Sequence, residues 1–328
     1  MISLKRSQNG LSLIELMIAI GLSMILSLGV IQIFSSSKQT SRVQDSLARL
    51  QENARFALDL LAHDIRMAGQ LGCDSSVKPT DNTNLLRPFG NGIFGYEYAG
   101  LPAELLIGNA SNPSSANIIA GTDTIIVMSA AINSIPTKKN TTAAVRAKTP
   151  GEFAEIETGD PLLVSDCETA EIFIADKVDD NTINANPNLS KRYRDFSLLS
   201  PLNYSAYYIR EKDNQKNLYR SLVNHSGVNT GIDTTPLLEG VENMQILYGE
   251  DINGDGNSIR YVAANAAGLN MEKVSSIRIH LLLATLEDGL ASEPQDYWFN
   301  GNNETATDKR LYRSFTTTIK LRNQGTSI

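Results

Sequence analysis

The chain has 328 residues, of which 41% are hydrophobic and 20% are charged, and its formal net charge is -7 at pH 7. This length accommodates one large domain or two smaller ones, and the composition suits a globular protein with one membrane segment. The acidic balance argues against a general nucleic-acid-binding protein, which needs a basic surface.

Residues 1–10 form a short polar leader that carries Lys5 and Arg6, and an apolar run follows over residues 11–34. About 20 apolar residues cross a bilayer, so this run predicts a transmembrane helix. The two cations favour a cytoplasmic N-terminus and place the rest of the chain in the periplasm. Glu15 is the only charged residue of the run, and a carboxylate there usually marks a function.

The order of residues around Gly10 suggests a partner for Glu15. Cleavage after Gly10 would give Leu11 a new α-amino group, which could neutralise Glu15 of a neighbouring subunit. Gly10 followed by LSLIELMI resembles the type III signal of type IV prepilins. The resemblance implies that a membrane-embedded prepilin peptidase cuts after Gly10 and methylates Leu11. The sequence departs from the family at Leu11, where phenylalanine is commonest, and at Gln32, where many major pilins have proline.

Two other interpretations of the N-terminus remain open. A secretory signal would be cut at small residues after the apolar run, where the sequence is Ser-Ser-Ser-Lys. A plain single-span anchor fits the length but leaves Glu15 without a role.

An apolar residue recurs every three or four positions beyond Phe34, which predicts an amphipathic half of the helix over residues 35–72. Gly69 and Gly72 favour a helix end, so residues 11–68 predict one helix of about 87 Å. We expect its apolar stripe to lie against the chain's own sheet, with a dimeric coiled coil as the alternative. The stripe consists of Val43, Leu47, Leu50, Ala54, Leu58, Leu61, Ile65 and Ala68.

Residues 73–328 are richer in Asn, Gly, Pro, Ser and Thr and predict a β-rich periplasmic head. REKDNQKN, between Tyr207 and Tyr219, indicates a hairpin turn. Residues 237–247 fit either a short helix or a strand, and long loops are expected over 74–100, 133–150 and 179–204. The predicted strands are Thr124–Met128, Ile172–Ala175, Ala206–Ile209, Asn217–Arg220, Ser275–Leu283 and Ser314–Leu321.

The chain has two cysteines, Cys73 and Cys167. An oxidising compartment permits a disulfide between them, with two buried thiols as the alternative. Such a link would tie the end of the long helix to the middle of the head. The chain-entropy treatment gives a crosslink of this loop length roughly 4–5 kcal/mol.

The whole layout resembles the PilW family of minor pilins. Three segments carry the likeness: ARFALDLLAHDIRMAGQLGC at 54–73, VENMQILYGEDINGDG at 241–256, and FTTTIKLRN at 315–323. The resemblance implies an α+β lollipop fold, with one long N-terminal helix packed on an antiparallel sheet. It also implies that Glu15 serves subunit assembly.

The segment Asp251-Ile-Asn253-Gly-Asp255-Gly-Asn257 matches the front of an EF-hand loop, with oxygen ligands at alternate positions and glycine at the sixth. The twelfth position, normally a bidentate glutamate, is Val262. A weaker calcium site over Asp251, Asn253, Asp255 and Asn257 is one hypothesis, with Glu250 as a further ligand. The alternative is an Asx-rich turn that satisfies its own backbone.

The sequence contains no Gly-rich phosphate loop, G-x-S-x-G or C-x-x-C motif, so we expect no catalytic residue. His63, His225 and His280 fit no metal spacing. The basic cluster at residues 191–194 is expected to be a solvated loop rather than a DNA contact.

The resemblance implies a minor pilin that joins other minor pilins at the inner membrane, primes type IV pilus assembly and ends at the tip. A large tip adhesin is a further expected partner, and the pilus could serve twitching motility, adhesion or DNA uptake. The alternatives are a pseudopilin of type II secretion and a membrane-anchored periplasmic enzyme.

Overall fold

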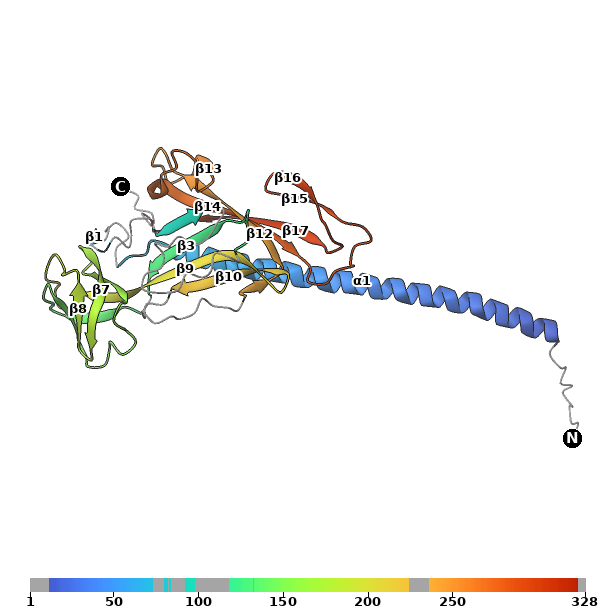
Figure 1. Ribbon diagram of the computed structural model, residues 1–328, viewed down its shortest axis with the longest axis horizontal. Coiled ribbons are helices and arrows are strands. Elements are labelled where there is room, and N and C mark those ends of the chain that lie inside the picture. The colour runs from blue at the N-terminus through green and yellow to red at the C-terminus, as the bar shows by residue number, and fades with distance from the viewer. Residues whose placement is uncertain are drawn as a thin grey trace, which may run out of the picture.

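The computed structural model describes residues 12–72, 80–81, 83, 92–97, 118–131, 133–223 and 236–323. One long helix projects from a β-rich head, and the N-terminus lies at the far end of this stem (Figure 1). The predicted α+β lollipop fold is confirmed.

Helix α1 spans Leu13–Met67, which is 55 residues or about 82 Å. It begins after Ser12 and ends at Ala68, whose N–H donates to the carbonyl of Ile65 at 3.2 Å. Gly69 follows with a φ of 71°, a left-handed conformation that glycine adopts without strain and that commonly ends a helix. The predicted single helix is therefore observed within a few residues of its expected ends.

The two halves of α1 have opposite surroundings. Leu13 is 79% exposed and Phe34 is 72% exposed, whereas Leu61 and Ile65 are fully buried. The buried side chains of the second half pack into the head of the same chain, so the stripe lies against its own sheet as expected. Those side chains are Leu50, Ala54, Ala57, Leu61, Ala62 and Ile65.

Two sheets and a hairpin make up the described part of the head, and every described pairing is antiparallel except that of β1 with β7. The larger sheet contains β1 (Thr80–Asp81), β2 (Ile93–Tyr96), β3 (Thr124–Ala130), β4 (Ile135–Lys138), β5 (Ala144–Ala147), β6 (Pro161–Ser165), β7 (Ala170–Asp179), β8 (Thr182–Asn186), β9 (Leu198–Lys212), β10 (Gln215–Val223) and β11 (Leu238–Glu239). The smaller sheet has the order β13 (Arg260–Val262), β12 (Val241–Glu250), β14 (Val274–Ala284) and β17 (Tyr312–Lys320). The short helix η3 (Met271–Lys273) precedes β14, and β15 (Asp296–Phe299) pairs with β16 (Asn302–Thr305).

The main core forms where α1 meets both sheets. Alternate residues of β14 point toward the helix. Ile319 of β17 lies opposite Ile277 of β14 and joins the same core. The larger sheet contributes Ile125, Tyr207 and Leu218 to the same core. This arrangement explains why a helix with one apolar stripe needs no second chain to bury it.

Six strands of the larger sheet close into a small barrel. β6 pairs with β7, β7 with β8, β8 with β5, β5 with β4, β4 with β9, and β9 again with β6. The barrel lies at the end of the head farthest from the N-terminus (Figure 1). Its buried interior consists of Val145, Ala147, Phe153, Ile156, Leu162, Val164, Phe173, Ala175, Ile183, Ala185, Leu189, Tyr193 and Leu199.

The barrel corrects two expectations from the sequence. Segments 133–150 and 179–204, predicted as long loops, contain β4, β5, β8 and the start of β9. Part of segment 74–100 also forms β1 and β2, and residues 237–247 form strands rather than a helix. The strands within the expected loops were missed because several have only four or five residues and alternate with polar side chains, as β8 does.

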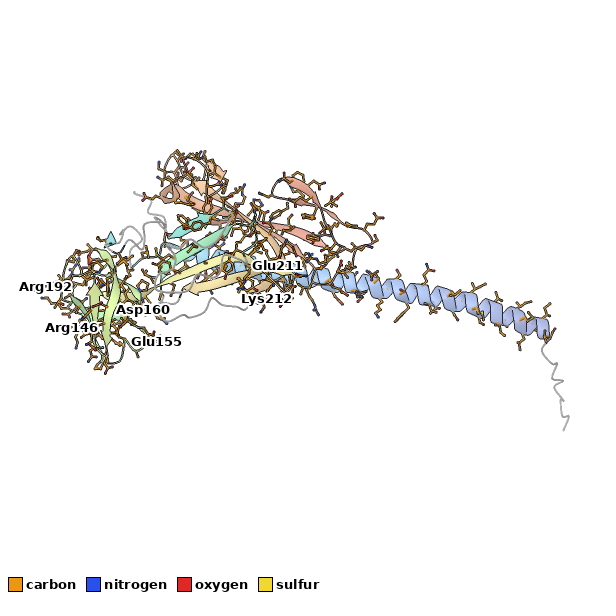
Figure 2. The ribbon with its side chains drawn as sticks, viewed as in Figure 1. Arg146, Glu155, Asp160, Arg192, Glu211 and Lys212 are labelled. Carbon is orange, nitrogen blue, oxygen red and sulfur yellow. The ribbon has the colours of Figure 1, made fainter. Side chains whose placement is uncertain are left out.

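The predicted hairpin between β9 and β10 is confirmed. Its turn residues Asp213 and Asn214 have φ values of 54° and 59°, which the tight turns of two-residue hairpins require. Figure 2 shows Glu211 and Lys212 beside this turn, close to where α1 leaves the head, whereas Arg146 and Arg192 lie on the distal barrel.

Candidate assembly interface

The exposed half of α1 is the largest apolar surface of the described chain. Its large hydrophobic side chains from Leu13 to Phe34 are all about half or more exposed. Fully burying one such side chain contributes about 1.5–3 kcal/mol, so a surface of this size favours lipid or a bundle of helices over water. Within the described residues, α1 is also the one helix long and apolar enough to cross a membrane.

Glu15 lies in the first turn of α1, within this exposed apolar surface. Its backbone N–H donates to the carbonyl of Ser12 at 3.1 Å. A carboxylate at a helix N-terminus is favoured by the partial positive charge of the unpaired N–H groups. Gly10 and Leu11 lie outside the described residues, so the pairing of Glu15 with a new N-terminus stays a prediction.

A polar network holds the second half of α1 on the head. Asp64 accepts hydrogen bonds from Tyr207 Oη at 2.6 Å and from Arg220 Nη2 at 2.7 Å, and Arg220 also donates to Ser205 at 3.2 Å. Burial, followed by the charge of Asp64, raises the pKa of Tyr207, so its hydroxyl remains a donor. This network fixes the rotation of the helix on the larger sheet, because the apolar stripe alone allows small slips.

A second polar contact lies where α1 leaves the head. Arg42 pairs with Glu287, and Gln39 Nε2 donates to the carbonyl of Leu290 at 3.2 Å. A cavity of about 470 Å³ separates α1 from the end of β14 beside this contact. The head therefore holds the stem at two levels, one near each end of the buried stripe.

The loop over Asp251–Asn257 is organised by its own backbone. Asp251 accepts from the N–H groups of Gly254 and Gly256, each at 2.7 Å, and Asp255 accepts from Asn257 at 2.8 Å. The Asn257 N–H lowers the pKa of the Asp255 carboxyl.

The proposed fifth calcium ligand has other partners. Glu250 accepts from Arg260 Nε at 2.6 Å and from the Asn270 N–H at 2.8 Å. No group of three or more His, Cys, Asp or Glu side chains suited to a metal ion is found in the part of the chain that the structure describes. Calcium binding by Asp251, Asn253 and their neighbours stays a prediction.

The basic cluster at residues 191–194 and the histidines are the other candidate residues from the sequence. Lys191 pairs with Asp166 at 2.8 Å, Arg194 pairs with Glu168 at 2.8 Å, and Tyr193 is buried in the barrel. Acidic partners therefore neutralise Lys191 and Arg194, whereas Arg192 is exposed. His63 is exposed on α1, His280 shares a hydrogen bond with Thr316 at 2.9 Å, and His225 lies outside the described residues.

Cys167 lies in the turn between β6 and β7, and Cys73 lies outside the described residues. Gly72 packs against Ser165, since a Cβ placed on Gly72 would lie 2.9 Å from Ser165 Oγ. The chain just before Cys73 therefore runs beside the chain just before Cys167. Their disulfide stays a prediction with this proximity in its favour.

A carboxylate that no sequence motif indicates is buried between the two sheets. Asp123 Oδ2 accepts from the Ile246 N–H at 2.7 Å, and the Asp123 N–H donates to Met244 at 2.9 Å. Burial raises the pKa of Asp123 to about 7. The hydrogen bond from Ile246 lowers this pKa, and the charge of Glu97 raises it further. The hydroxyl of Tyr248, fully buried nearby, has no hydrogen-bond partner among the described residues.

Two protein families match this chain, one near its N-terminus and one over its C-terminal part. Residues 5–31 match the prokaryotic N-terminal methylation motif, and residues 206–323 match the family of type IV pilus-assembly protein W, PilW. No curated protein and no solved structure matches the chain. The first match covers the exposed half of the stem with Glu15, and the second covers most of the sheet against which the stem packs. Over residues 5–31 and 206–323, the chain is therefore similar to type IV pilins of the PilW family.

Proposed function

We propose that this chain is a minor pilin, cleaved by prepilin peptidase between Gly10 and Leu11 and methylated at the new N-terminus. It then joins other minor pilins in an inner-membrane complex that primes pilus assembly and becomes the tip. No catalytic role is assigned, because the PilW family is a structural component of the pilus.

The observation that carries this proposal is the division of α1. Its second half is held in the head by buried contacts, whereas its first half exposes fifteen large apolar side chains that no part of the described head covers. Lipid covers such a surface before assembly, and the helices of neighbouring pilins cover it afterwards. The same helix can therefore leave the membrane without exposing its apolar side chains to water.

Glu15 sets the axial register between neighbouring subunits during this transfer. A buried carboxylate needs a partner, and the amine of Leu11 in an adjacent subunit supplies one. Four residues separate the two groups, or about 6 Å along the helix. An axial shift of about this size, extended by the reach of the side chain, brings the amine of one subunit level with the carboxylate of the next. Other shifts leave both charges unpaired.

The barrel supports a position at the tip. It lies at the opposite end of the molecule from the stem's N-terminus (Figure 1), so it is the part farthest from the membrane. At a pilus tip, it would face the surroundings and could contact a large adhesin, which we propose as a further partner.

Fractionation of native cells tests the role of Glu15. In Glu15→Val, we expect normal cleavage but at least tenfold less protein in sheared filaments, with the excess retained in the inner membrane. The control is Glu52→Val, which removes an exposed acidic residue from the second half of α1. Normal entry of the Glu15 variant into filaments would refute the assembly role, and immunogold labelling along the whole filament would refute the tip position.

A further inference from the structure

Strand β17 forms one edge of the smaller sheet. It pairs with β14 over nine residues, and no other described strand pairs with it. The N–H and the C=O of Tyr312 bond to the side chain of Gln295, so this residue points its backbone away from β14. Backbone direction alternates along an antiparallel strand, and therefore Ser314, Thr316 and Thr318 also direct their N–H and C=O groups outward.

The side chain of Gln295 occupies the first position of this edge as a peptide group would. Its Oε1 accepts from the Tyr312 N–H at 3.1 Å, and its Nε2 donates to the Tyr312 carbonyl at 3.2 Å. The ring of Tyr297 stacks on Tyr312 at 4.9 Å. Beyond this point, no protein group among the described residues bonds to the outward backbone of Ser314, Thr316 or Thr318, and all three are exposed.

This open edge lacks the usual protection against pairing. An exposed strand of several residues is a template for another strand unless a charge, proline or bulge interrupts it. The sequence from Ser314 to Ile319, SFTTTI, contains no charge and no proline, and its pairing with β14 has no bulge. Its four β-branched residues favour an extended partner.

Charge indicates the chemistry of that partner. Residues 309–328 contain five basic and no acidic side chains, although the whole chain has a net charge of -7. Arg313 and Arg322 are exposed near the two ends of the edge, and neither forms an ion pair within the described residues. Lys320 is partly offset by Asp255.

A second copy of the same strand fits poorly. Antiparallel pairing of β17 with itself would bring together two segments that each carry Arg313, Lys320 and Arg322 and no acidic residue, and these like charges repel each other. We propose that β17 accepts an extended, net-acidic segment of a partner protein, which adds one strand to the smaller sheet. This proposal stands on the geometry of β17 and not on the filament role.

The test uses the full chain in detergent and a synthetic peptide of about twelve residues. The peptide alternates Thr and Val and has Glu at both ends, and a matched peptide has Lys there instead. By fluorescence anisotropy at low salt, we expect at least tenfold tighter binding of the acidic peptide. Amide exchange at Thr316 and Thr318 should slow when it binds.

A proline at Ser314 isolates the backbone contribution. Ser314→Pro removes one outward N–H and leaves the bonds to β14 intact, so binding should fall at least tenfold at an unchanged unfolding midpoint. Ser314→Ala, which changes the side chain alone, should bind normally. If the proline variant unfolds, the double variant Arg313→Glu/Arg322→Glu replaces it and should prefer the Lys peptide.

The proposal is overturned by any of three results. The first is no binding of the acidic peptide at millimolar concentration. The second is equal affinity for both peptides, or affinity that a folded Ser314→Pro variant retains. The third is self-association of the chain that the same proline abolishes, which would assign the edge to a second copy.

Discussion

Asp123 should make the head less stable as the pH rises. Its pKa increases from 3.8 to about 7 on folding because it is buried between the sheets. A raised folded-state pKa favours the protonated form, so the stabilisation is complete below pH 3.8 and is lost as the pH rises through 7. The groups that face it are Glu97, Tyr248 and the N–H of Ile246.

The size of the effect follows from the shift. About three pH units at roughly 1.4 kcal/mol each set an upper limit of about 4 kcal/mol, and relaxation makes roughly 2–4 kcal/mol a reasonable range. Asp123→Asn keeps an oxygen that can accept from Ile246 but cannot ionise. We therefore expect the free energy of unfolding of this variant to exceed that of the wild type by roughly 2–4 kcal/mol at pH 8 and to equal it near pH 4.

Urea unfolding of the detergent-solubilised chain, followed by circular dichroism, measures this difference. The control is Asp180→Asn, because Asp180 is exposed. Its stability should follow the wild type at both pH values. If Asp123→Asn gains no stability at pH 8, or if it parallels the wild type at every pH, then Asp123 is not a buried ionising group and the description of the sheet junction is wrong.

Three further predictions concern single contacts. Gly92→Ala should destabilise strongly because a Cβ there would lie 2.2 Å from the backbone of Gly69, whereas Gly121→Ala, also at positive φ but with no neighbour within 4 Å, should cost much less in a thermal melt. Asp251→Ala should lower stability by about 1–2 kcal/mol even with a chelator present, since Asp251 accepts backbone N–H groups; an effect seen only with calcium would contradict this. Reduction of the predicted Cys73–Cys167 disulfide should cost roughly 4–5 kcal/mol, and non-reducing peptide mapping that finds both thiols free would remove the prediction.

Local patterns in the sequence predict the parts of the fold that depend on local order. The stripe through Leu50 and Leu61 repeats over several turns, and such a signal specifies both the helix and its buried face. β14 and β17 alternate in the same clear way. Glu15 was identified because a single carboxylate contrasts with its apolar neighbours.

The barrel and the sheet junction depend on contacts between distant segments. β9 pairs with both β4 and β6, and nothing in those short segments shows which strand closes the ring. Asp123, between two threonines, has the local appearance of a turn residue, and only the approach of β12 buries it. Likewise, the role of Gln295 as a partner of the Tyr312 backbone depends on the fold, which brings these two distant residues together.

In the proposed filament, a new N-terminus at Leu11 pairs with Glu15 of a neighbouring subunit. Mass spectrometry of the N-terminal peptide, from pili sheared off native cells, tests it most directly. We expect the chain in these pili to begin with N-methylated Leu11. A chain in those pili that still begins with Met1 would contradict it, because Glu15 would then have no cation to meet.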